Sequence, residues 1–170
     1  VQAAQTVLGA DLVDLYRYTQ AQDHFDLPPV QVAHRYYPSV RKDRIYEDDV
    51  VYAVVRDKQF RYSTEAQQDP LLTPPFTVVR PDSPAARFVE REQVRSTAIV
   101  PLLVGNEVVG VMFANFRTRQ TFRQPQREMI EIFASEAAIA IRNARLLEQA
   151  QRNVAQLSAL FRVSDIVGRA

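Results

Sequence analysis

The sequence has no cysteine among its 170 residues. This absence excludes disulfides, thiol nucleophiles, thiolate metal sites and a chromophore attached through a thioether bond. Glycine is scarce as well, and four glycines argue against a glycine-rich loop that cradles phosphate groups. No nucleophile motif or catalytic pair of carboxylates stands out. We therefore expect that this chain is not itself an enzyme.

Long apolar runs and a strong net charge are also missing. No stretch approaches the roughly 18 apolar residues that a membrane span needs, and the formal net charge is only +1. We therefore expect no membrane contact and no nucleic-acid partner. No signal-peptide pattern opens the chain, which favours a cytoplasmic location. The opening "VQAAQTVLG" reads as the end of a helix already in progress, so we expect a piece of a longer protein.

Histidine and clustered basic residues add little to the candidate chemistry. The two histidines, His24 and His34, show no ligand-like spacing with a carboxylate, so no metal site is expected. A local basic cluster consists of Arg117, Arg119, Arg123 and Arg127. It could attract an anion, but a solvated loop before a helix is the favoured interpretation.

The apolar fraction of 46% is enough to fill a core. We expect the stretch "VPLLVGNEVVGVMFANF" (residues 100–116) to form the centre of that core. This stretch predicts two strands joined at Gly105-Asn106, with Val104 opposite Glu107. Counting outward from that turn predicts Pro101 opposite Gly110, where the lack of a side chain lets another backbone approach. The predicted faces hold, on one side, Ile99, Leu103, Val108 and Met112, and on the other Ala98, Val100, Leu102, Val109, Val111 and Phe113. Both faces are apolar, so both must be covered.

Shorter elements precede this hairpin. The spacing predicts a helix over residues 1–8 that ends at Gly9, and a long-tipped hairpin over residues 12–37. Residues 50–57 predict a short helix capped by Asp48 or Asp49, although their valines would equally suit a strand. Further predictions are a strand over residues 60–64 and a helix over residues 84–92, which starts at Pro84.

A long helix follows the hairpin, because no helix breaker occurs between Pro125 and Gly168. It would measure about 65 Å at 1.5 Å per residue. Its first half has an apolar stripe that can cover one face of the hairpin: Ile130, Phe133, Ala137, Ile141 and Ala144. Its second half has a seam with alternating steps of three and four: Leu147, Ala150, Val154, Leu157 and Phe161. This seam predicts a homodimer, or packing against a following domain.

Residues 94–150 resemble the GAF domain, a small-molecule sensor module of signalling proteins. The likeness rests on Ser96, Val100-Pro101-Leu102, Val109-Gly110-Val111 and the run from Ala137 to Ala144. It implies an α+β fold with an antiparallel sheet of five or six strands. Helices from both chain ends would cover one face, and loops and short helices from the middle would cover the other. The implied organisation is a sensor domain over residues 1–148 and a helical linker over residues 149–170.

The resemblance also implies a pocket between the sheet and residues 38–93. Aromatic and polar residues are the candidates to line it: Tyr16, Tyr36, Arg61, Phe76, Phe88, Arg95 and Thr97. Aromatic residues at strand spacing are, however, more often plain core. Cyclic-nucleotide-binding members have an Asn-Lys…Phe-x-x-x-Asp-Glu signature, and the Lys, Asp and Glu are missing around Asn115 and Phe122. The ligand is therefore unknown, and a covalently attached bilin is excluded.

The sequence thus predicts a non-enzymatic sensory domain. A small molecule or partner would bias the packing under the long helix, and that helix would act on a downstream output domain such as a histidine kinase or cyclase. The alternative is a ligand-free structural module that dimerises and spaces its neighbours.

Overall fold

The computed structural model describes residues 2–33, 45, 47, 49–72 and 88–167. The predicted site residues Tyr36 and Phe76 lie outside these ranges, as do residues 34–37 of the predicted strand and 84–87 of the predicted helix. The elements in chain order are α1 (Gln2–Leu8), β1 (Leu12–Thr19), η1 (Gln20–Gln22), β2 (His24–Phe25), β3 (Val30–Ala33), α2 (Val50–Asp57), β4 (Arg61–Ser63), η2 (Ala66–Gln68), α3 (Phe88–Arg91), β5 (Ser96–Val104), β6 (Glu107–Phe116) and α4 (Gln124–Val167).

The strands form one antiparallel six-stranded sheet in the order β2-β1-β6-β5-β4, and β3 also pairs with β1. β3 pairs with the start of β1, with Leu12 opposite Ala33, whereas β2 pairs with its end, with Tyr18 opposite Phe25. The sheet confirms the predicted fold class. The hairpin predicted over residues 12–37 is confirmed as far as Ala33.

The register of the central hairpin departs from the prediction beyond its turn. Leu103 lies opposite Val108 as predicted, but Leu102 then pairs with Gly110 and not with Val109. One extra residue is accommodated as a bulge in β6. Because side chains alternate along a strand, a one-residue shift reverses the face of everything that follows.

The bulge therefore corrects the predicted faces. Met112 packs on the side of the sheet that α4 covers, together with Val100. Val111 and Phe113 pack on the opposite side, together with Ile99. The predicted facing of these three β6 residues was wrong.

Gly110 does allow the close backbone approach that its missing side chain suggested. A Cβ atom at this position would lie 2.7 Å from the backbone oxygen of Tyr16 on β1. Its cross-strand partner in β5 is Leu102, not the predicted Pro101.

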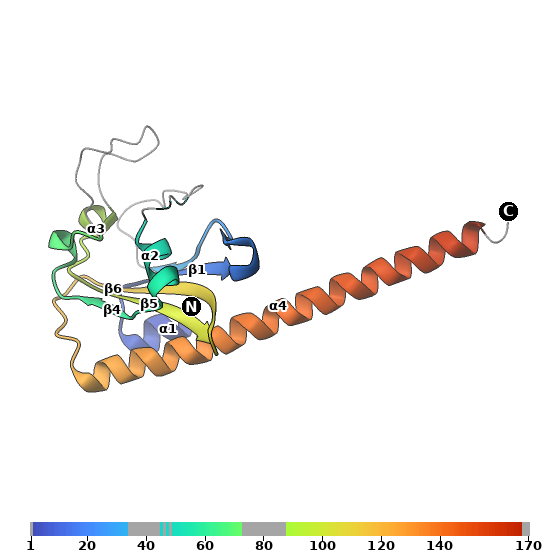
Figure 1. The fold of residues 1–170 in the computed structure, drawn as a ribbon. Coiled ribbons are helices and arrows are strands. Elements are labelled where there is room, and N and C mark those ends of the chain that lie inside the picture. Colours follow the sequence, from blue (N-terminus) through green and yellow to red (C-terminus); the bar gives the residue numbers. More distant parts are fainter. Residues whose placement is uncertain (1, 34–44, 46, 48, 73–87, 168–170) are drawn as a thin grey trace.

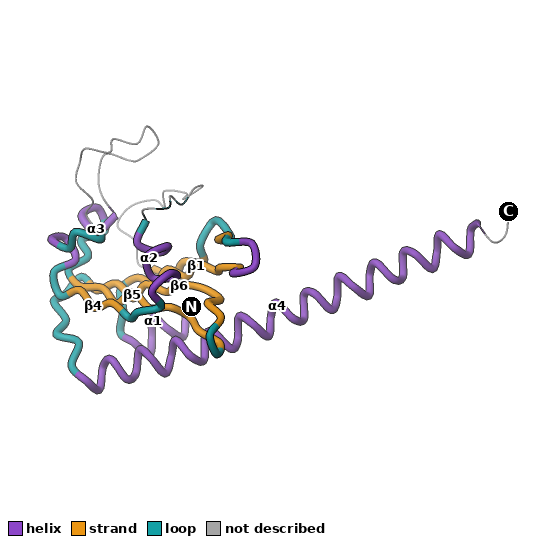
Figure 2. Tube along the Cα trace, viewed as in Figure 1, coloured by secondary structure: helices purple, strands orange, loops and turns teal. Residues whose placement is uncertain are grey.

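The two faces of the sheet are covered by different parts of the chain. Helices α1 and α4 cover the face that we call the α4 face, and α2 covers the opposite face, which we call the α2 face (Figures 1 and 2). On the α4 face Ile130, Ala134 and Ala138 of α4 are buried in the core. Of the predicted stripe only Ala144 is exposed.

On the α2 face the valines of α2 fill the core. Val51, Val54 and Val55 pack against Tyr16 and Val111 of the sheet. Asp49 is the N-cap of α2 and has an extended backbone, so the helix prediction for residues 50–57 is confirmed over the strand alternative. Leu12, Ala66, Val89 and Val94 form a second, smaller cluster near η2 and α3.

Tyr62 joins β4 to α4 and gives a prediction for alkaline pH. Its hydroxyl donates a hydrogen bond to Glu131 over 3.2 Å. Burial, and then the charge of Glu131, raises the pKa of Tyr62 to about 12 from the usual 10.0. The raised pKa contributes stability that is fully present below pH 10 and is lost as the pH rises toward 12. The free energy of unfolding should therefore fall more steeply above pH 10 in the parent chain than in Tyr62→Phe, as measured by urea unfolding. Parallel pH profiles would contradict this.

Candidate functional site

A row of polar side chains crosses the α2 face between the two apolar clusters. It consists of Gln31 on β3, Asp14 on β1, Asn115 on β6 and Thr97 on β5, and we call it the polar row. Asp14, Asn115 and Thr97 are buried, with exposed fractions of 4%, 1% and 0%. Four strands thus bring hydrogen-bonding groups into an otherwise apolar sheet.

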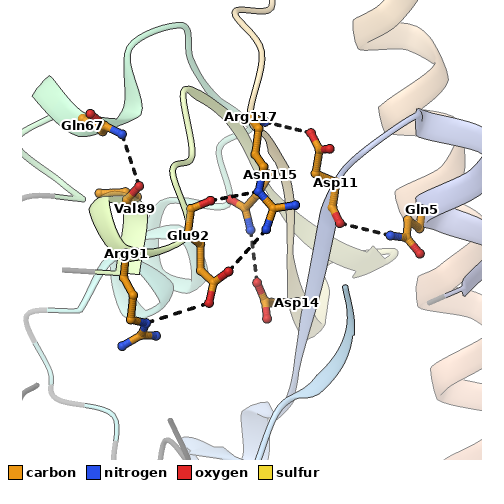
Figure 3. Close-up of polar contacts among 9 residues, drawn as sticks. All are labelled: Gln5, Asp11, Asp14, Gln67, Val89, Arg91, Glu92, Asn115 and Arg117. Atoms are coloured by element: carbon orange, nitrogen blue, oxygen red, sulfur yellow. Dashed lines mark hydrogen bonds and ion pairs between the residues drawn. The ribbon is translucent and has the colours of Figure 1, made fainter. Parts of the chain in front are cut away.

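Hydrogen bonds run continuously along this row. The amides of Gln31 and Asn115 donate to the two carboxylate oxygens of Asp14, over 2.6 Å and 3.1 Å. The hydroxyl of Thr97 donates to the Asn115 side-chain oxygen over 2.7 Å. Figure 3 shows the contact between Asp14 and Asn115. A buried carboxylate is tolerated only when hydrogen bonds or charges compensate it, and both of its oxygens accept one here.

The chemical capacity of the row exceeds these bonds. Each side-chain amide has a second N–H, and each hydroxyl or carboxylate oxygen can accept more than one hydrogen bond. The row therefore holds donors and acceptors in fixed positions within the α2 face. Sequence analysis found Thr97 but missed Asp14, Gln31 and Asn115. The signal was Asp14, an acidic residue in the middle of the buried strand "LVDLY".

An ionic cluster lies beside the polar row and closes the end of β6 (Figure 3). Glu92 is 0% exposed, and Arg117 donates to its backbone oxygen over 3.1 Å and to its carboxylate over 3.4 Å. The backbone N–H of Arg117 donates to Asp11 over 2.8 Å. Arg91 lies 3.9 Å from the second carboxylate oxygen of Glu92.

The interpretation of the basic cluster as a solvated loop fails for Arg117, and Arg119 and Arg127 also make contacts. Arg117 is mostly buried, Arg119 forms an ion pair with Glu65 over 3.0 Å, and Arg127 donates to the Phe122 backbone oxygen over 2.7 Å. Three of the four arginines, Arg119, Arg123 and Arg127, are nevertheless exposed. Arg117 is thus the member of this cluster that packs into the domain.

The predicted ligand residues are only partly brought together. Tyr16 and Thr97 are buried on the α2 face, and Tyr16 packs edge-on against Phe25 and Phe113. Arg61 is ion-paired with Asp57 at the end of α2. Phe88 packs on the smaller cluster near α3, and Arg95 is exposed.

Asn115 is the junction of the polar row, so its removal tests the row directly. Asn115→Ala should lower the free energy of unfolding by about 1–3 kcal/mol, because Asp14 loses a donor and Thr97 loses an acceptor inside the core. Urea unfolding measures this effect. The matched control is Asn153→Ala on the exposed surface of α4, which should leave stability nearly unchanged. Equal effects of the two substitutions would refute the importance of the row.

A second surface of interest runs along α4 on the side turned away from the sheet. Its exposed apolar residues are Met129, Ile132, Ile139, Leu146, Leu147, Val154, Leu157, Leu160 and Phe161. At 100° per residue they occupy one side of the helix, opposite Ala134. We call this set the outer stripe. It includes four residues of the predicted seam, and the fifth, Ala150, is also exposed; however, the stripe begins at Met129, well before Leu147.

The described ranges contain neither a metal-binding cluster nor a membrane-spanning helix. No group of three or more His, Cys, Asp or Glu side chains there is placed to hold a metal ion. No helix in the same ranges is long and apolar enough to cross a membrane.

Comparison with known proteins shows which family and which solved structures this chain is similar to. The model of the GAF domain family matches residues 1–141, whereas no curated protein matches the sequence. A GAF domain/HD domain protein from Geobacter sulfurreducens is 17% identical, with a TM-score of 0.62 and coverage of 85% of this chain and 89% of that one. The GAF domain of a two-component sensor histidine kinase from Bacillus halodurans is 12% identical, with a TM-score of 0.59 and coverage of 85% and 90%. The blue-light absorbing form of the Thermosynechococcus elongatus PixJ GAF domain is 15% identical, with a TM-score of 0.58 and coverage of 92% and 88%.

Proposed function

The chain belongs to the GAF domain family, and on that premise we propose that it is a sensory domain that binds a small polar molecule on the α2 face. The observation that carries this proposal is the polar row. Ligand pockets are mostly apolar with a few precisely placed polar groups. The row supplies such groups between two apolar clusters.

The row also limits the chemistry of the ligand. Asp14 favours a ligand with hydrogen-bond donors or a positive charge, and the amides of Gln31 and Asn115 suit either donors or acceptors. Tyr16 and Thr97 stay in the proposed contact set, together with the predicted Tyr36, Arg61, Phe76, Phe88 and Arg95. A chromophore linked through a thioether is excluded because the chain has no cysteine.

The sensory role is supported by the structurally similar proteins, among them the GAF domain of a two-component sensor histidine kinase. In this proposal the sensor domain spans residues 1–148, and residues 149–170 lead to an output domain. Two copies would pair through the outer stripe of α4, since exposed apolar side chains on one side of a helix gain free energy when a partner covers them. The cytoplasm remains the expected location.

One observation favours the alternative, a ligand-free dimerisation module. Val51, Val54 and Val55 of α2 already fill much of the α2 face. The outer stripe would then be the functional surface. The polar row would only hold the strands of the sheet together.

Native mass spectrometry of the purified chain, compared with its denatured mass, separates the two proposals. A dimer with extra small-molecule mass supports the sensor, and Asp14→Asn should reduce that extra mass. A bare dimer, unchanged by a metabolite extract, supports the dimerisation module. A bare monomer contradicts the proposed pairing through the outer stripe.

A further inference from the structure

Arg145 is the last side chain of α4 that the domain holds. Its side chain is 24% exposed, whereas every side chain from Leu146 to Phe161 is exposed. The direction in which α4 leaves the domain is therefore set near this residue.

Arg145 lies against the far end of β1 and the residue that follows β2. Its Nη1 donates to the backbone oxygen of Tyr18 over 2.6 Å. Its Nη2 lies 3.9 Å from Asp26, makes no hydrogen bond, and is buried. Arg17 reaches the same Asp26 oxygen over 3.3 Å. One half of the guanidinium is thus firmly bound, and the other half is about 1 Å too far for a charge-assisted hydrogen bond.

Tyr18 connects this contact to α2. Its ring lies 4.8 Å from that of Phe25, and Phe25 lies 5.0 Å edge-on from Tyr52 of α2. The Tyr18 hydroxyl donates to Asp23 over 2.6 Å, which fixes the loop between β1 and β2. Two ring contacts and one hydrogen bond to the Tyr18 backbone oxygen therefore join α2 to α4 across the sheet.

We propose that Arg145 is a positioning residue that couples the packing of α2 to the exit direction of α4. A movement of Tyr52 shifts Phe25 and the β1–β2 end, and this shift opens or closes the distance between Asp26 and Nη2. Because this ion pair can be either open or completed by a hydrogen bond, the contact has two discrete arrangements that bias α4 differently. The inference rests on the proposed sensory function and names the contact that would serve it.

The test needs no ligand, so its failure is separate from failure of ligand binding. Gln22 and Gln151 are exposed on the loop and on α4, and the chain has no native cysteine. The double variant Gln22→Cys/Gln151→Cys therefore takes spin labels selectively, and pulsed electron paramagnetic resonance gives the distribution of distances between the two labels. The perturbation is Tyr52→Leu, measured with and without Arg145→Ala. The control is Arg142→Ala, an exposed arginine one turn earlier on α4.

We expect Tyr52→Leu to shift the distance distribution in the parent chain and in Arg142→Ala. In Arg145→Ala the distribution should be broader, and Tyr52→Leu should shift it no further; Arg145→Lys should restore part of the response. If Arg145 only fastened α4 to the sheet, the shift caused by Tyr52→Leu would persist in Arg145→Ala, and that result would overturn the proposal. Absence of any shift in the parent chain would overturn it too. If Tyr52→Leu fails to fold by circular dichroism, Phe25→Leu provides the same perturbation one contact closer.

Discussion

Phe122→Ala is expected to lower the free energy of unfolding by about 3–5 kcal/mol, the usual range for truncating a buried aromatic residue. Phe122 is 1% exposed, and its ring packs 5.8 Å from Phe116 and 5.3 Å from Tyr62. Its backbone φ is 44°, in the left-handed region that residues with a Cβ rarely adopt. Packing must hold the residue in this conformation, and it does so immediately before α4 begins.

Chemical unfolding measures this effect, and Phe122→Leu is the matched variant. Leucine keeps most of the buried volume, so its cost should stay below about 1.5 kcal/mol. A loss of less than about 1 kcal/mol in Phe122→Ala would mean that the loop repacks without its anchor. The ring contacts would then be incidental.

Leu157→Asp should abolish or strongly weaken self-association, with a dissociation constant at least about 100-fold higher. Leu157 lies within the outer stripe and is 56% exposed in the single chain. A carboxylate buried in a helix pair without a partner costs several kcal/mol, and each 1.4 kcal/mol is a factor of ten in affinity. Ile139→Asp should act in the same direction, because the stripe extends back past it.

Sedimentation at several protein concentrations measures the dissociation constant. Ala159→Asp is the matched control, since Ala159 is exposed on the side of α4 opposite the stripe. If Leu157→Asp and Ala159→Asp sediment alike, the outer stripe is not the interface. If Leu157→Asp alone has an effect, the interface is confined to the seam after Leu147.

The hairpin register shows where the sequence pattern stops being informative. Residues 98–104 of β5 and 108–114 of β6 are apolar on both faces, so a shift by one residue there exchanges one apolar side chain for another. Hydrophobic alternation specifies register only where the two faces differ. The turn at Gly105 therefore predicted the nearest pairs correctly, and the bulge beyond Leu103 left no trace in the pattern.

The polar row was hidden for a different reason. Asp14, Gln31, Thr97 and Asn115 lie on four different strands, and their hydrogen bonds depend on the order of strands in the sheet. A strand order of β3-β1-β6-β5 makes neighbours of residues 101 positions apart, such as Asp14 and Asn115. Helix periodicity, in contrast, depends on local spacing alone, and α4 was predicted almost to the residue.

The contact of Arg145 with β1 could not be predicted from the sequence either. Its position on α4 places Arg145 beside the sheet. Nothing in "RNARLLEQ", however, indicates that its side chain donates a hydrogen bond to a backbone oxygen of β1. Long polar side chains can reach over neighbouring elements, so their partners follow from tertiary structure and not from the helical pattern.

The unbroken length of α4 has a mechanical consequence. From Arg145 to Val167 the helix continues for about 33 Å at 1.5 Å per residue without a proline or glycine. A stiff rod pivoting at its last anchored point acts as a lever, and a tilt of about 5° would move the far end by about 3 Å. A rearrangement of one ion pair, too small to change the sheet, is thereby magnified to the width of an atom at the other end of the chain.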